Sequence, residues 1–81
     1  MTGKEAMRFA MSERGMSQQS VADAAGYKRQ TNVSEVLRSD NARIDNLIRI
    51  LNACGYDVEM VDRTDPEKRY TITKCDTPTQ V

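Results

Sequence analysis

The segment from residue 17 to residue 37, SQQSVADAAGYKRQTNVSEVL, restricts the fold of this chain more than any other segment. Its first half carries three apolar residues at the spacing of one buried helical stripe, namely Val21, Ala22 and Ala25. Gly26 then stands where that helix must stop and the chain must reverse, a position that favours a residue tolerating positive φ. A second helix follows and buries a smaller set, Val33, Val36 and Leu37. The segment therefore predicts two short helices joined by a tight turn.

The second of these helices presents an outward face made of polar side chains: Gln30, Thr31, Asn32, Ser34, Glu35 and Arg38. Such a face could simply be solvated, but it has no Lys/Glu pairs spaced four residues apart and it is rich in amides and hydroxyls. Those groups hydrogen-bond to base edges in the major groove of DNA, where Gln or Asn pairs with adenine through two bonds. Glu35 can accept from cytosine or orient Arg38 instead. We therefore predict a helix-turn-helix DNA reader whose base-reading residues are Gln30, Thr31, Asn32, Ser34 and Glu35.

Basic residues flank the predicted reading helix at both ends, and these are Lys28, Arg29, Arg38 and Arg43. Each one alone fits an ordinary solvated charge. Together they bracket the helix as phosphate contacts do, because such contacts fix the register of a protein on DNA before bases are read. We predict that all four contact DNA phosphates.

Length and composition limit the other functions that the chain could have. With 81 residues it is one small domain, near the lower end of what a single core stabilises. Residues 1–56 hold eight basic and six acidic residues, and residues 57–81 hold four and six, so a weakly basic half precedes a weakly acidic one. The chain has no histidine, no Gly-rich phosphate loop and no paired carboxylates on one helical face, so we expect neither an enzyme nor a metal or cofactor site.

Cysteines and hydropathy indicate a cytoplasmic protein. Cys54 falls in the apolar pattern of a helix and is expected to be a buried thiol, whereas Cys75 lies near a polar end and is expected to be inert. No signal peptide is recognisable, and no apolar run reaches the ~18 residues that a membrane span requires. We expect no membrane association.

Caps and spacing predict two further helices and the starts of the two already described. Thr2 and Glu5 form a capping box before a helix of about residues 3–14, with Met7, Ala10, Met11 and Ala6 inward and Gly15 at its end. Ser17 is expected to cap the next helix and Thr31 the third. After a polar break at residues 39–42, apolar residues recur at i, i+3, i+4 and i+7, namely Ile44, Leu47, Ile48 and Leu51, and Gly55 ends that helix.

From Tyr56 onward the apolar period changes to two, which is typical of half-buried strands. Two strands alone are marginal in water, so we predict that these strands meet their copies in a second subunit. The residues of that dimer interface are expected to be Val58, Met60, Tyr70 and Ile72. The predicted organisation is a DNA-binding part over residues 1–56, a β-rich dimerisation segment over 57–75 and a disordered tail over 76–81.

Position by position, the start of the two-helix segment resembles the helix-turn-helix of the phage Cro/repressor family, also called the xenobiotic-response-element family. The matching residues are Met16, Ser17, Gln18, Val21, Ala22 and Gly26, and the resemblance continues through residues 33–37 and 46–56 to cover about residues 3–62. It departs in two places. Val33 lies seven rather than six positions after Gly26, so the turn is one residue longer than the common form, and Arg43 stands where many members have a Ser or Thr helix cap.

The resemblance implies a mainly α fold of four to five helices, followed by a short β-hairpin or strand pair. It implies a phosphate contact for Gln18 and a sequence-specific repressor or autoregulator of transcription. One such unit reads only a few base pairs, so a homodimer on an inverted repeat is expected. The β-rich tail resembles, more loosely, that of small antitoxin-like regulators. The alternative is therefore an antitoxin that binds a toxin through its tail and its own operator through its helices.

Overall fold

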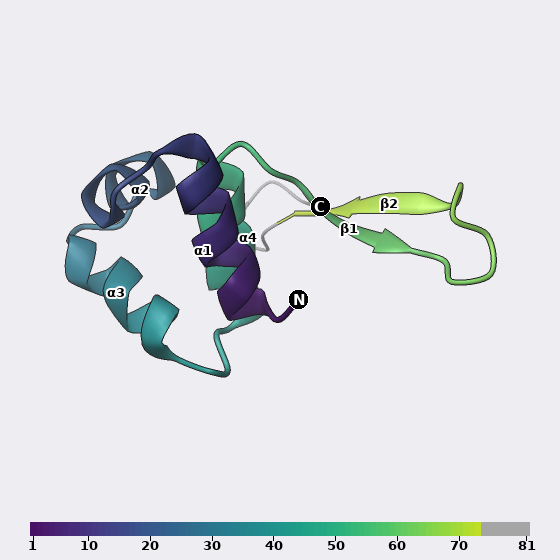
Figure 1. Cartoon of the computed structure of the whole chain (residues 1–81), viewed down its shortest axis with the longest axis horizontal. Helices are drawn as coiled ribbons and strands as arrows, with labels where there is room; N and C mark the ends of the chain where they lie inside the picture. The colour runs from purple at the N-terminus through teal and green to yellow at the C-terminus, as the bar shows by residue number, and fades with distance from the viewer. Residues whose placement is uncertain (74–81) are drawn as a thin grey trace, which may run out of the picture.

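The structure, a computed structural model, describes residues 1–73 of the chain. Its elements are α1 (Gly3–Arg14), α2 (Gln18–Ala25), α3 (Gln30–Arg38), α4 (Ile44–Ala53), β1 (Val58–Val61) and β2 (Arg69–Ile72). The helices gather into one body, and the β1–β2 hairpin projects away from it (Figure 1). The predicted mainly helical fold with a C-terminal β-hairpin is confirmed, with four helices in the described part. Cys75 and the predicted disordered tail lie outside the described residues.

Local signals place the ends of the first two helices as predicted. The Thr2 hydroxyl accepts a hydrogen bond from the Glu5 N–H at 3.1 Å, and the Glu5 carboxylate accepts one from the Thr2 N–H at 2.8 Å. Ser17 caps α2 by accepting from the Ser20 N–H at 3.1 Å. Gly15 and Gly26 follow α1 and α2 with φ of 63° and 83°, in the left-handed region that favours glycine.

The start of α3 differs from the prediction. Arg29, not Thr31, occupies the N-cap, and the helix begins at Gln30. Asn32 lies at the third helical position, where its side-chain oxygen accepts a hydrogen bond from the Arg29 N–H at 3.2 Å. Because Asn32 already satisfies a free amide at this end, the helix begins earlier than a Thr31 cap would place it.

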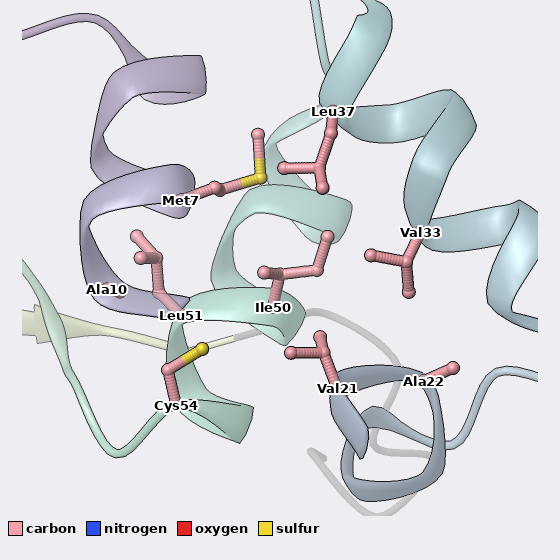
Figure 2. Packing of buried hydrophobic residues seen from close by; sticks show 9 residues of the cluster. All are labelled: Met7, Ala10, Val21, Ala22, Val33, Leu37, Ile50, Leu51 and Cys54. Atoms are coloured by element: carbon pink, nitrogen blue, oxygen red, sulfur yellow. The ribbon is translucent and has the colours of Figure 1, made fainter. Parts of the chain in front are cut away.

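The core lies between the helices, with each of them contributing buried side chains (Figure 2). These are Met7, Ala10, Val21, Ala22, Val33, Leu37, Ile50, Leu51 and Cys54. The predicted stripes of α1, α2 and α3 thus face inward, with Ala6, Met11 and Val36 partly buried against the core. The thiol of Cys54 is buried and free, as predicted.

The inward face of α4 was predicted only in part. Ile48 and Leu51 are buried, but Ile44 is 55% exposed and Ile50, which was not predicted, is fully buried. Apolar residues at six of its ten positions make α4 apolar around much of its circumference. Spacing alone therefore cannot select the core face, and packing against α1 and α2 turns Ile50 and Cys54 inward.

The two strands form an antiparallel hairpin in the predicted alternation. Val58 lies opposite Ile72, and Met60 lies opposite Tyr70, so these four side chains share one face of the hairpin. On the other face Arg69 and Glu59 form an ion pair at 3.1 Å.

Arg14 fixes the point at which the hairpin leaves the helical body. Its Nε donates to the carbonyl of Cys54 at 2.9 Å, and its guanidinium lies 4.6 Å from the centroid of the Tyr56 ring. The last residue of α1 therefore holds the C-terminal end of α4 and the residue that leads into β1.

Candidate nucleic-acid interface

The outward face of α3 is the centre of the candidate interface. Gln30, Thr31 and Glu35 are exposed, whereas Asn32 and Ser34 are half-buried. The structure therefore separates the five predicted base-reading residues into an exposed group of three and a recessed group of two. The three exposed side chains supply an amide, a hydroxyl and a carboxylate, the groups that distinguish base edges in the major groove.

The two recessed residues already make hydrogen bonds within the protein. The Asn32 side-chain oxygen accepts from the Arg29 N–H, which leaves its amide NH₂ to donate elsewhere. The Ser34 hydroxyl donates to the Thr31 carbonyl at 3.3 Å. Ser34 therefore keeps only acceptor capacity for another partner.

Exposed cations flank α3 at both ends, as the sequence suggests. Lys28 and Arg29 immediately precede the helix, Arg38 is its last residue, and Arg43 is the N-cap of α4. All four side chains are exposed. Gln18 is half-buried at the first position of α2.

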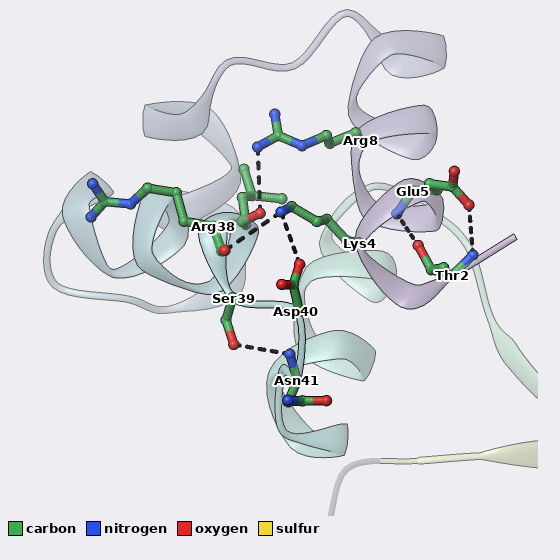
Figure 3. A network of polar contacts seen from close by, with 9 residues as sticks. Thr2, Lys4, Glu5, Arg8, Arg38, Ser39, Asp40 and Asn41 are labelled. Carbon is green, nitrogen blue, oxygen red and sulfur yellow. Dashed lines mark hydrogen bonds and ion pairs between the residues drawn. The ribbon is translucent and has the colours of Figure 1, made fainter.

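Contacts that the sequence does not predict hold the C-terminal end of α3. Lys4 donates to the Arg38 carbonyl at 3.5 Å and pairs with Asp40 at 3.3 Å, and Arg8 donates to the Leu37 carbonyl at 3.4 Å (Figure 3). Cations are favourable there because the last carbonyls of a helix carry partial negative charge. Two basic residues of α1 thereby fix the end of the candidate reading helix.

An open cavity of about 320 Å³ lies between α3 and the start of α4. It brings together three predicted contact residues from the two sides, namely Asn32, Glu35 and Arg43. Tyr27 and Asn46 also line it. The carboxylate and the guanidinium thus border the same cavity beside the outward face of α3.

Sequence reasoning does not single out Tyr27, although it lines this cavity and has two partners on α4. Its hydroxyl donates to the Asn46 side-chain oxygen at 2.7 Å, and the Arg49 guanidinium lies 5.2 Å from its ring centroid. Burial raises the pKa of the Tyr27 hydroxyl, and the nearby charge of Arg49 partly offsets that rise.

Residues 1–73 contain neither a cluster of metal-ligating side chains nor a membrane-spanning helix. No group of three or more His, Cys, Asp or Glu side chains is gathered there to hold a metal ion. No helix in this part is long and apolar enough to cross a membrane. A second, more apolar cleft of about 250 Å³ is lined by α1 residues such as Phe9 together with Leu51 and Tyr56, on elements other than α3.

Comparison with known families identifies the kind of domain that carries these residues. A family model described as helix-turn-helix matches residues 7–61, which run from within α1 to the end of β1. Comparison with curated proteins and with solved structures gives no match.

Proposed function

Because the chain belongs to the Cro/C1-type helix-turn-helix family, whose domains are DNA-binding and regulatory, we propose that it represses transcription by binding one operator as a homodimer. In this proposal α3 lies in the major groove of each half-site. Such a regulator acts in the cytoplasm of a bacterial host, where its operator DNA lies.

The observation that carries the proposal is the exposed ridge of α3 between two pairs of cations. Thr31 and Glu35, one helical turn apart, point away from the side that Val33 and Leu37 bury, and Gln30 is exposed at the N-terminal end of the helix. A helix held in this way can enter a groove without unfolding any part of the domain. Asn32 and Ser34 are recessed, and we assign them base contacts that use the Asn32 amide NH₂ and the Ser34 oxygen.

Phosphate contacts in the proposal come from the four exposed cations and from Gln18. Lys28 and Arg29 meet the backbone on one side of the groove, and Arg38 and Arg43 meet it on the other. Gln18 stands in the first turn of α2, where backbone N–H groups also favour a phosphate oxygen. These contacts supply affinity and register, whereas the α3 ridge supplies sequence preference.

The hairpin supports the homodimer. Met60 and Tyr70 face the same side and are 57% and 56% exposed, with Val58 and Ile72 half-buried beside them. A two-stranded sheet also has open hydrogen-bonding edges on both sides. Association of two hairpins about a two-fold axis covers the apolar face and pairs the operator-reading helices with an inverted repeat.

The same apolar face makes an antitoxin the second candidate function, because a toxin could occupy it in place of a second subunit. Purification of the chain from its native host distinguishes the two. A toxin that copurifies in a fixed ratio favours the antitoxin, whereas the chain recovered only with itself favours the simple repressor.

The proposal is tested by selecting duplexes from a randomised library with the full chain and footprinting the chain on the DNA upstream of its own gene. We expect an inverted repeat whose half-sites are centred about one helical turn apart, roughly 34 Å, with protection of major-groove positions. Recovery of duplexes that share no sequence would contradict specific binding.

A further inference from the structure

Three apolar side chains anchor α3 to the core, and one of them, Val36, is only partly buried. The helix packs chiefly against α2 and to a smaller extent against α1. Its two fully buried side chains, Val33 and Leu37, are one helical turn apart and point toward Ile50 and Met7 (Figure 2). Val33 and Leu37 lie along one line on the helix, and Val36 beside that line is only partly buried, so the packing fixes the position of α3 better than its rotation.

The open cavity of about 320 Å³ lies on the α4 side of α3. It adds to the freedom of the helix to rotate. The Lys4 and Arg8 contacts hold only the C-terminal end of α3. The orientation of the N-terminal end, where Gln30 stands, must therefore come from the turn that precedes it.

Tyr27 is the residue of that turn that reaches α4. Its N–H donates to the Ala22 carbonyl at 2.9 Å, which ties it to the end of α2. Its hydroxyl donates to Asn46, and its ring lies beneath Arg49 one turn further along α4. The turn is one residue longer than the form common in the family, and each added residue brings backbone freedom that some contact must remove.

We infer that Tyr27 is a positioning residue of the DNA interface, which holds the α2–α3 turn against α4 and so sets the orientation in which α3 meets the major groove. The inference rests on the proposed function, because it takes α3 as the helix that reads bases.

Loss of this anchor should affect specific and random DNA differently. Hydrogen bonds to base edges need donor–acceptor distances of about 2.7–3.2 Å, so a small rotation of α3 breaks them. Long, flexible Lys and Arg side chains follow a phosphate through the same rotation. Disturbing Tyr27 should therefore lower discrimination between sequences while leaving the affinity for random DNA nearly unchanged.

The test uses the full chain with two duplexes, the one that the wild-type chain selects from a randomised library and a scrambled duplex of the same composition. Tyr27→Phe removes the hydroxyl but keeps the ring beneath Arg49, and Asn46→Ala removes the acceptor. Tyr56→Phe is the matched control, because Tyr56 also lies beside an arginine, Arg14, but at the hairpin end of the body. Affinities are measured well below the unfolding temperature of each variant.

We expect Tyr27→Phe and Asn46→Ala each to lower the ratio of selected to scrambled affinity roughly three- to tenfold, the worth of one neutral hydrogen bond. The double variant should lose no more than Tyr27→Phe alone, because Tyr27→Phe already removes the bond that Asn46→Ala removes. Tyr56→Phe should keep the ratio. A purely structural role of Tyr27 would lower the unfolding temperature and leave the ratio intact.

An unchanged ratio in folded Tyr27→Phe and in Asn46→Ala would overturn the inference, and Asn46→Ala decides alone if Tyr27→Phe does not fold. The affinity of Gln30→Ala for the same two duplexes distinguishes a failure of the positioning role from a failure of the proposed function. If Gln30→Ala lowers the ratio and the other two variants do not, only the positioning role is wrong. If Gln30→Ala also leaves the ratio unchanged, α3 is not the reading helix.

Discussion

Hydrogen-bond geometry distinguishes two amide side chains of α3 that look equivalent in sequence. Asn32 uses its oxygen to accept from the Arg29 N–H at the start of the helix. For Gln30, which is exposed, the structure of residues 1–73 shows no hydrogen bond of the side chain. Two-bond pairing with adenine would require Asn32 to give up a capping contact worth about 1 kcal/mol. Gln30 can pair at no such cost and is the stronger candidate for reading adenine.

The flanking cations are predicted to contribute equally to binding of every DNA sequence. Replacing Lys28, Arg29 or Arg43 with Gln should weaken binding to selected and scrambled duplexes alike. Each lost phosphate contact should lower the slope of log affinity against log salt by roughly one, because fewer counterions are released. Titrations at several salt concentrations measure this slope.

Arg63 serves as the matched control for these variants, because it is an exposed cation in the loop between the strands. Arg63→Gln should leave the slope unchanged. Slopes equal to that of the wild type in all three test variants would remove those residues from the interface.

The thiol of Cys54 should be poorly reactive in the folded protein. Burial raises its pKa, with Arg14 opposing that rise to a smaller extent, so less thiolate is present at a given pH than for an exposed cysteine. In a Cys75→Ser background, alkylation of the native chain at pH 8 should be at least roughly tenfold slower than in denaturant and should accelerate as the pH rises. Equal native and denatured rates would show that the thiol is accessible.

At the scale of secondary-structure elements, the sequence predicts what local chemistry determines. The capping box of α1, the Ser17 cap of α2, the glycines after both helices and the strand alternation depend on residues a few positions apart, and all are confirmed. The start of α3 was placed wrongly because Asn32 competed with Thr31 as the capping side chain. Both residue types favour helix starts, so the sequence alone does not decide between them.

Contacts between distant residues could not be predicted in this way. The Tyr27–Asn46 bond joins residues 19 positions apart, and the Arg8 and Lys4 contacts with α3 span 29 and 34. No periodicity links such partners. For the candidate site, the sequence therefore indicates which residues face outward on α3, but not which residues hold that helix in place.

The face of α4 gives a paired stability prediction. Ile50→Ala removes a fully buried side chain and should lower the free energy of unfolding by about 2–5 kcal/mol. Ile44→Ala changes a side chain that is 55% exposed and should cost much less, about 1 kcal/mol or below. Denaturant unfolding of the two variants measures the difference. A larger cost for Ile44→Ala than for Ile50→Ala would show that Ile44 lies on the core face of α4, as the sequence predicts.

At the scale of the whole molecule, the projecting hairpin is the feature that a single subunit leaves unexplained. Its apolar face is half-exposed at Met60 and Tyr70, and an isolated two-stranded hairpin gains little stability in water. In the proposed function the helical body contacts DNA, and the hairpin provides the surface on which two subunits associate. The proposed dimer assigns a role to both parts.

Adjacent residues on β1 test that dimer. Met60→Glu places a charge on the shared apolar face and should convert the chain to a monomer with weak operator binding, because a buried unpaired carboxylate is costly. Val61→Glu places the same charge on the opposite face and should remain dimeric. Sedimentation at matched concentrations measures both. If the Met60→Glu chain still sediments as a dimer, the hairpin is not the dimer interface and the helices must supply it.

The central claim, that the exposed ridge of α3 reads bases, is tested most directly by Gln30→Ala on selected and scrambled duplexes. Loss of a two-bond base contact should cost about 1–3 kcal/mol on the selected duplex and almost nothing on the scrambled one. We expect the folded variant to lose affinity for the selected duplex alone. An equal loss on both duplexes, or none on either, would contradict α3 as the reading helix.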